Sequence, residues 1–339
     1  MGVPSNTAQT FNFTTIREDL SEIVYLISPT ETPIFNAIGR KGVFTQSFHE
    51  WSEVQLANPS SGNAQVEGND PSATAVTTAN RLGNYAQLMD KVAQVSDTAE
   101  RVLSAGNVTK LAKQVLYHTL ELRRDMEARL LDPAAAGVVG NSSTARQTAS
   151  LPNFLLNNVS RGSGGSNPTY SGGTSGSAPS ILATGYPNAA MTLGTTRPFT
   201  EDLLASVLQT IWTNGGNANM IVTSGFNKRV ASTFSGNASR FKKAEDKRLI
   251  AAIEVYESDF GQLQVVPSRQ LTFVADTTLS KSIVLILDTE MADVGWLQPM
   301  RNAPLSKTGH SERRMIWAEW GVICGNERAH GLVSDLTTS

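Results

Sequence analysis

Residues 97–131, DTAERVLSAGNVTKLAKQVLYHTLELRRDMEARLL, form the longest helical signal in this chain. Apolar side chains recur in it at three- and four-residue steps, which places them on one face of a helix. They are Val108, Leu111, Val115, Leu122 and Met126, and the stripe is widened by Ala112 and Leu116. From Val108 to Leu131 such a helix would be about 36 Å long at roughly 1.5 Å per residue. We therefore expect a long helix on which the other parts are assembled.

The opposite face of this helix carries opposite charges at helical spacing. Arg123 precedes Glu127 by four residues, and Asp125 precedes Arg129 by the same step. Pairs of this kind stabilise an exposed helix face, so we expect that face to be solvated. Asp132 should end the helix, because the residue before a proline avoids helical geometry.

Composition excludes several classes of protein. The chain has 339 residues, of which 17% are charged, and its formal net charge of −2 excludes a nucleic-acid binder that acts through overall charge. Its one cysteine, Cys324, rules out an intrachain disulfide framework. No apolar run is as long as a membrane span, and the first residues lack the pattern of a signal peptide. A soluble protein made in a reducing compartment is expected.

Two predicted strands, 43–56 and 82–95, flank a long polar segment that is almost empty of large apolar residues. In the first strand, one side should carry Phe44, Phe48, Val54 and Leu56. A structureless loop of this length argues against burial inside one compact domain. An isolated two-stranded hairpin is also not stable in water. We infer a projecting hairpin that needs a neighbouring subunit to hold it.

The second half of the chain begins with a Gly/Ser/Asn-rich region, in which residues 160–179 are predicted to be a mobile surface loop. An α/β pattern follows, with a helix after Thr200, a buried strand from Met220 and a second helix from Phe226. The unbroken apolar run from Ser282 predicts another buried strand. The last long strand has a period of two, with one face made of Ile316, Ala318, Trp320, Val322 and Cys324.

Enzyme chemistry has no recognisable constellation in this sequence. Its four histidines are not spaced as metal ligands on a helix, and no Gly-x-Ser-x-Gly elbow occurs. Cys324 lies on an apolar strand face, which favours a core residue over a nucleophile. Glu50 and Glu53 fall on opposite sides of a predicted strand and make a poor acid/base pair. We predict no catalytic, cofactor-binding or metal-binding residues.

Several segments, in this order and spacing, resemble the major capsid (head) proteins of tailed bacteriophages with the Hong Kong 97 (HK97-like) fold. They are ISPTETPIFNAIG from Ile27, the pair Glu50-Trp51, VSDTAERVLSAG from Val95, ELRRDMEARLL from Glu121, VYESDFGQLQVVPSR from Val255, LSKTGHSERRMIWAEW from Leu305, and NERAHGLVSDL from Asn326. Each motif alone would be weak evidence, and none is catalytic. Their co-occurrence over nearly the whole chain makes the resemblance specific.

The resemblance implies an α+β fold with the parts of that family. These would be an N-arm with a short helix (1–39), an extended E-loop hairpin (40–96), the P-domain spine helix (97–139), the A-domain (140–292), the P-domain strands (293–325) and a C-terminal segment returning to the A-domain (326–339). Candidate contacts between subunits are Phe44, Phe48, Trp51 and Glu67 on the E-loop. On the spine helix, the candidates for salt bridges or for the inner face are Arg123, Arg124 and Arg129.

The function implied is that of a major capsid protein, which self-assembles into hexamers and pentamers and forms the icosahedral head shell around a double-stranded DNA genome. Its partners would be copies of itself, a portal protein, scaffolding and decoration proteins, and the packaged DNA through weak non-specific contact. No membrane partner and no cofactor is expected. The chain would reside in the virion capsid after assembly in the bacterial host cytoplasm.

Two alternatives stay open at the level of the sequence. A cellular nanocompartment shell would share the fold but enclose cargo enzymes in place of a genome. A hydrolase or surface-binding enzyme with a dispersed site would be a monomer or small oligomer, with a deep pocket lined by perturbed titratable groups.

Overall fold

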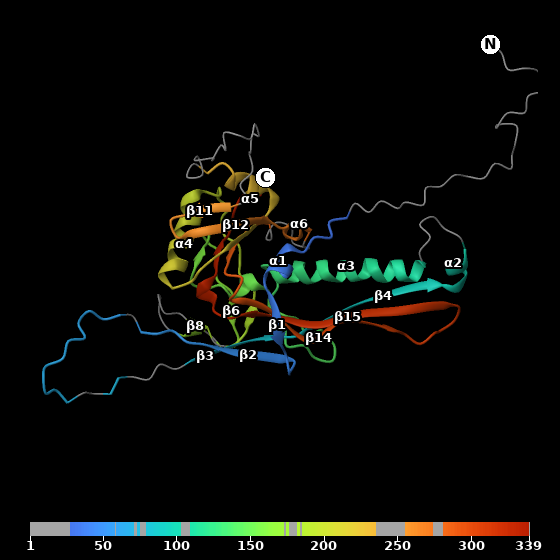
Figure 1. The fold of residues 1–339 in the computed structure, drawn as a ribbon, viewed down its shortest axis with the longest axis horizontal. Helices are drawn as coiled ribbons and strands as arrows, with labels where there is room; N and C mark the ends of the chain where they lie inside the picture. The colour runs from blue at the N-terminus through green and yellow to red at the C-terminus, as the bar shows by residue number, and fades with distance from the viewer. Residues whose placement is uncertain are drawn as a thin grey trace, which may run out of the picture.

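A long helix, two β-sheets and a projecting loop make up the computed structural model of the chain (Figure 1). The residues that it describes are 28–57, 59–70, 73–74, 79–102, 109–172, 174–175, 182–183, 185–234, 255–273 and 281–338. The long helix runs beside the first sheet, and the second sheet with its helices lies at the C-terminal end of that helix (Figure 1).

The first sheet has four strands and lies along the helix α3, Lys110–Leu131 (Figure 1). In spatial order the strands are β1 (Gly39–Val43), β14 (Ala292–Pro304), β15 (Ser311–Cys324) and β4 (Gln87–Ser96). β1 is parallel to β14, and the other neighbours are antiparallel. The alternation predicted for the last long strand is confirmed, because the buried residues of β15 include Ile316, Ala318, Trp320, Val322 and Cys324.

The predicted helix is confirmed in its length and in its C-terminal end at Asp132. Its apolar stripe is confirmed at Leu111, Leu122 and Met126, which are buried, whereas Val108 lies outside the described residues. The widening of the stripe is wrong at both residues, because Ala112 is exposed and Leu116 is 57% exposed. The first half of the helix therefore buries only a narrow stripe of side chains, and the second half buries a wider one.

The predicted charge pairs on the helix are wrong. Asp125 forms an ion pair with Lys91 of β4 at 2.9 Å, and Arg129 donates to backbone carbonyl oxygens. Glu127 is fully buried, because the short helix α1 (Pro33–Ala37) and the segment at Ser268 cover this end of α3. The second half of the helix is thus covered around Glu127, while Arg123 on that half stays exposed.

The second sheet has six strands in the order β11 (Val255–Ser258), β12 (Gly261–Pro267), β10 (Met220–Thr223), β13 (Val284–Leu287), β16 (Gly331–Val333) and β5 (Val159–Ser160). Its helices are α4 (Glu201–Thr213), α5 (Gly225–Ala231) and α6 (Gln270–Phe273). The predicted α/β alternation and the two predicted buried strands, β10 and β13, are confirmed. The C-terminal strand β16 pairs with β13, so the end of the chain is part of this sheet.

The remaining elements are smaller. They are α2 (Asp97–Arg101), the 3-10 helices η2 (Leu151–Phe154) and η4 (Glu327–Ala329), and the strand pairs β6 (Thr169–Tyr170) with β9 (Pro187–Ala189) and β7 (Thr174–Ser175) with β8 (Leu182–Ala183). The surface-loop prediction for residues 160–179 is wrong at Tyr170, which is buried. Its hydroxyl donates to the carbonyl oxygens of Asn153 and Phe154, at 3.3 and 3.1 Å, and this anchors the region.

The predicted hairpin is shorter than the sequence indicates. β2 (Phe48–Glu53) pairs with β3 (Asn80–Tyr85), and the chain then crosses at Ala86 into β4 of the first sheet. The predicted strand 82–95 is therefore divided between two sheets. Val54 and Leu56 lie beyond the end of β2 and are 52% and 80% exposed. From this short root, the following loop projects away from the body of the molecule (Figure 1).

Glu127 gives the folded chain a pH dependence. Its carboxylate accepts from the backbone N–H of Phe35 at 3.3 Å and from the Ser268 hydroxyl at 3.0 Å, and burial raises its pKa from 4.5 to about 7. Between pH 4.5 and about pH 7, Glu127 keeps its proton in the folded state but has lost it in the unfolded state. Folding stability therefore falls as the pH rises through the window.

We expect Glu127→Gln to remove the part of this stability loss that comes from ionisation of Glu127. Between pH 5 and pH 8, the wild-type chain should lose about 2–3 kcal/mol more unfolding free energy than the variant, at roughly 1.4 kcal/mol per pKa unit. Urea unfolding of the purified chain at the two pH values measures the difference. An equal loss in both proteins would contradict this role of the carboxyl group.

Candidate assembly surfaces

The root of the hairpin is fixed by aromatic packing on both of its faces. On the inner face, the ring of Trp51 lies 5.7 Å from that of Phe154, and Leu82 is buried beside it. On the outer face, the ring of Phe48 covers Gly83, where a β-carbon would lie 2.4 Å from it. Phe48 also packs against Tyr85 at a ring distance of 4.5 Å. Phe48 and Trp51 thus hold the root to its own chain.

Backbone hydrogen bonds hold the second edge of the hairpin. The N–H of Gly83 donates to the carbonyl of Gly185 at 2.8 Å, and the N–H of Gly185 donates to that of Arg81 at 2.9 Å. Gly185 has a φ of +85°, which residues with a side chain rarely adopt. β3 therefore has partners on both edges, and the root of the loop is rigid.

Phe44 fills a gap between two strands of the first sheet. Gly295 of β14 and Gly321 of β15 are directly opposite each other, and the Phe44 ring lies over both. The other face of this ring stacks on His49 at 4.5 Å, and Phe44 is 3% exposed. Its side chain is therefore used inside its own subunit.

The projecting loop is exposed throughout its described residues 56–57 and 59–70. Glu67 lies in a turn that is closed by a hydrogen bond from Asn69 to Gln65 and by Gly68 at a φ of +83°. Leu56 and Val66 are about four-fifths exposed, at 80% and 81%. The loop therefore exposes two large apolar side chains to solvent in the isolated chain.

The three arginines of α3 have three different environments. Arg123 is exposed, and Arg124 is half-buried with an Nε that has no hydrogen-bond partner among the described residues. Arg129 donates from Nε to the carbonyl of Thr148 at 2.9 Å and from Nη2 to that of Ala136 at 2.7 Å, and burial lowers its pKa to about 10. Arg129 therefore stabilises the fold, while Arg123 is open to a partner.

The structure does not bring the seven candidate residues into one site. Phe44, Phe48 and Trp51 pack around the hairpin root, Glu67 lies at the loop, and the arginines lie along α3. The arrangement consists of a rigid root, an exposed loop and an exposed helix face.

Sequence reasoning missed a further exposed surface on the first sheet. On the side away from α3, β4 exposes Leu88 (54%) and Val92 (43%). Val92 is opposite Met315 of β15, Leu88 is opposite Glu319, and Trp317 is opposite Asp90, between these two pairs. We call Leu88, Val92, Met315 and Trp317 the outer sheet face. Their alternation is present in the sequence, but assigning 82–95 to the hairpin concealed the fact that β4 belongs to the sheet.

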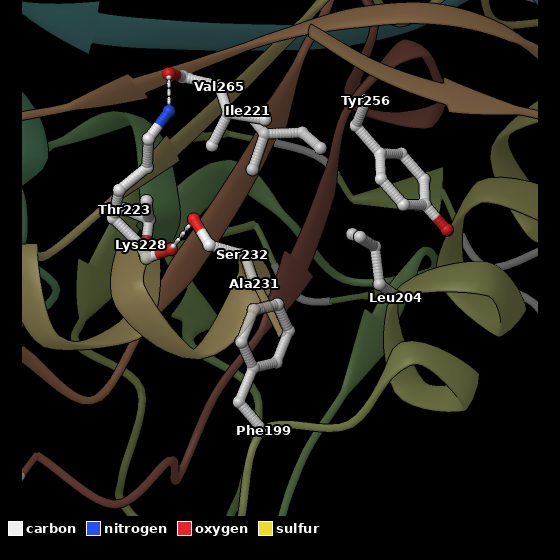
Figure 2. A pocket seen from close by; sticks show the side chains of 9 residues that line it. All are labelled: Phe199, Leu204, Ile221, Thr223, Lys228, Ala231, Ser232, Tyr256 and Val265. Atoms are coloured by element: carbon white, nitrogen blue, oxygen red, sulfur yellow. Dashed lines mark hydrogen bonds between the residues drawn. The ribbon is translucent and has the colours of Figure 1, made fainter. Parts of the chain in front are cut away.

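The polar groups of one apolar cavity are used within the chain. Figure 2 shows an apolar cavity between α4, α5 and the second sheet, with Lys228 and Tyr256 among the side chains that line it. Lys228 donates to the carbonyl of Val265 at 2.6 Å, and the Tyr256 hydroxyl donates to Glu201 at 3.3 Å. Burial, with the nearby Glu201 carboxylate, raises the pKa of Tyr256 to about 12. These polar groups are therefore engaged within the chain.

The described residues also lack a metal-binding cluster and a reactive thiol. No group of three or more His, Cys, Asp and Glu side chains could hold a metal ion within the described ranges. Cys324 is buried, and burial raises the pKa of its thiol well above the ordinary value, as expected for the predicted core residue. Among the helices described, none combines the length and apolar character that crossing a membrane requires.

Solved structures with this fold are known. One from Mycobacterium phage Bobi has a TM-score of 0.59 at 11% identity, with 96% of each chain covered. The capsid of the native GTA particle gives 0.58 at 12% identity, covering 95% of this chain and 96% of the other. The holo-SrpI encapsulin complex from Synechococcus elongatus gives 0.55 at 9% identity, covering 95% and 94%. The chain therefore has the HK97-like capsid fold, which confirms the predicted fold class.

Sequence comparison then separates this chain from others with the fold. The family model described as SU10 major capsid protein matches residues 3–337, and the chain belongs to this family. A relative, the major capsid protein of Escherichia phage Phieco32, is 24% identical over an alignment 343 residues long that covers 91% of this chain and 91% of the relative. The predicted family is confirmed, and the protein is a structural capsid protein and not an enzyme.

The Phe44 ring lies so close to Gly321 that a side chain at this position should disturb the sheet. A β-carbon at Gly321 would lie 2.6 Å from the Phe44 ring, so we expect Gly321→Ala to destabilise the subunit by about 1–3 kcal/mol through overpacking. Gly62 has open space around it, so Gly62→Ala is the matched control, with a change within about 0.5 kcal/mol. Urea unfolding of both variants measures this difference. Equal effects would show that Phe44 does not occupy the glycine gap.

Proposed function

We propose that this chain is the subunit of an icosahedral phage head and that it self-assembles into hexamers and pentamers around double-stranded DNA. Membership of the SU10 major capsid protein family and the HK97-like fold support this proposal. The observation that carries it furthest is the exposed loop, held by a rigid root and bearing apolar side chains without an internal partner. Ordering such a loop costs conformational entropy, which contact with a neighbour would offset.

The division of the chain follows the family in this proposal: N-arm and short helix (1–39), E-loop (40–96), spine helix (97–139), A-domain (140–292), P-domain strands (293–325) and returning segment (326–339). The pairing of β16 with β13 supports the return of the last segment. Within 40–96, β1 and β4 pair in the four-stranded sheet. The part that would extend over a neighbour is therefore the hairpin between β2 and β3.

The seven candidate residues take different parts in such an assembly. Phe44, Phe48 and Trp51 would set the direction of the hairpin, and Glu67 with the exposed apolar residues of the loop would touch the neighbouring subunit. The outer sheet face offers an apolar surface for that contact. Arg123 and Arg124 would pair with acidic groups of a neighbour or face the genome. Arg129 would keep α3 in place.

The partners proposed are copies of this chain, a portal protein, scaffolding and decoration proteins, and packaged DNA. A net charge of −2 supports weak, non-specific contact with DNA, because tight binding would require many paired phosphates. The mature location would be the virion capsid, and assembly would take place in the bacterial host cytoplasm. Heterologous contacts that close into rings build such a shell from one kind of subunit.

Imaging of the purified protein by negative-stain electron microscopy, with light scattering on the same sample, tests the proposal. We expect closed angular shells, or rings of five and six subunits. Particles with protein cargo and no DNA after expression in infected cells would favour a nanocompartment. A uniformly small particle at all salt and protein concentrations, and also in co-expression with the adjacent head genes, would contradict assembly.

The exposed face of α3 provides a second test. Arg123→Glu reverses an exposed charge, so the free energy of unfolding of the subunit should stay within about 0.5 kcal/mol of the wild-type value. Shell yield, measured by sedimentation, should fall several-fold, and the double variant with Arg124→Glu should lower it further. Lys113→Glu, at the other end of the same helix, is the charge-matched control. Unchanged yield in the double variant would remove these arginines from the interface.

A further inference from the structure

Glu53 is a buried carboxyl group at the point where the rigid hairpin root becomes the exposed loop. It is the last residue of β2 and is 4% exposed, while the next residue, Val54, is 52% exposed. Neither carboxyl oxygen of Glu53 has a hydrogen-bond partner among the described residues. A buried polar group without a partner is costly, and an ionised one is much more so.

The groups that face Glu53 come from three other elements. Glu327 and Arg328 belong to η4, Tyr170 to β6, and Cys324 to the end of β15. Burial first, and the Glu327 carboxyl group second, raise the pKa of Glu53 from 4.5 to about 7, and Arg328 acts against them. The cluster thus places two acidic groups together in a site that excludes water.

Most of these neighbours already have partners. The Glu327 carboxylate accepts from the backbone N–H groups of Leu156 and Asn157, at 2.9 and 3.2 Å, and from the Asn157 side chain. The Tyr170 hydroxyl donates to two backbone carbonyl oxygens. The Glu327 carboxylate has no proton to donate, and the Tyr170 O–H is already used, so neither group supplies a hydrogen bond to an ionised Glu53.

The strand pair ends at this residue. Glu53 is opposite Asn80, and this is the last pair of the β2–β3 ladder before the loop. The side-chain Nδ2 of Asn80 is also buried without a partner in the described part of the chain. One pair further in, Trp51 faces Leu82 and packs against Phe154. Opening of the Glu53–Asn80 pair would therefore release one carboxyl group to water while the aromatic root stays in place.

We propose that Glu53 is a proton-dependent latch at the root of the projecting hairpin. As a neutral acid it keeps the Glu53–Asn80 pair closed against the C-terminal segment at Glu327. As a carboxylate it leaves the cluster for water and opens that pair. The effect of the latch on contacts between subunits rests on the proposed assembly function, whereas the latch itself is a property of the isolated chain.

Hydrogen exchange of the unassembled full-length chain, corrected for the intrinsic rate at each pH, tests the latch. If Glu53 regains its ordinary pKa when the pair opens, the opening equilibrium should rise about tenfold between pH 6 and pH 8. Peptides that cover residues 48–57 and 80–86 should report it. Glu53→Gln should remove the pH dependence. Glu53→Leu should remove it as well, which shows that the effect does not come from the amide group of the glutamine. Glu127→Gln, at a buried carboxyl group outside this cluster, should retain it.

Two results would overturn the latch: no pH dependence of these peptides in the wild type, or the same tenfold change in Glu53→Gln. Neither result depends on shells, so failure of the latch and failure of the assembly proposal can be told apart. As a second measurement, shell yield of Glu53→Gln should vary less between pH 6 and pH 8 than that of the wild type. An identical variation would show that the Glu53 latch does not regulate assembly.

Discussion

The contact between α3 and the four-stranded sheet is the one on which the rest of this structure depends. Leu122 and Met126 of the helix and Trp320 of β15 are buried in one apolar cluster. The ring of Phe35 meets that of Trp320 edge-on at 6.1 Å, which brings α1 to the same core. The strands of this sheet come from three distant parts of the chain. Burial against one helix is what makes their joint formation favourable.

Buried polar groups then fix the second sheet relative to this core. Glu127 of α3 joins α1 to the segment at Ser268, immediately after β12. At the far side, the carboxylate of Asp335 accepts from the N–H groups of Gly162 and Gly194, both at 2.7 Å. Apolar packing alone would allow the packed elements to slide past one another, whereas each of these hydrogen bonds forms in only one arrangement. The body that carries the hairpin is thus specified as well as stabilised.

The spacing of apolar residues correctly predicted those elements that bury one face. The period of two in β15 and the apolar stripe of α3 each follow from one face being buried. The division of 82–95 at Ala86 could not be predicted, because alternation continues through the crossing and only the partner strand changes. Glu127 was assigned to a solvated face because nothing in the spacing shows that α1 lies over it. The roles of Phe44 and Arg129 were likewise decided by distant partners, namely a glycine pair and two backbone carbonyls.

A shell subunit must satisfy two opposing requirements, and this chain separates them along one strand pair. In the proposed assembly, the direction of the hairpin root would determine where the loop meets a neighbour, and aromatic packing at Trp51 and Phe48 holds that root. The loop would need freedom before assembly, because a preformed apolar surface would associate without order. Its polar composition with few apolar side chains favours a solvated loop in the isolated chain. The boundary between the two regimes therefore has to be sharp, and Glu53 occupies it, buried on one side and one residue from solvent on the other. A titratable group at that position changes the boundary without changing either the root or the loop.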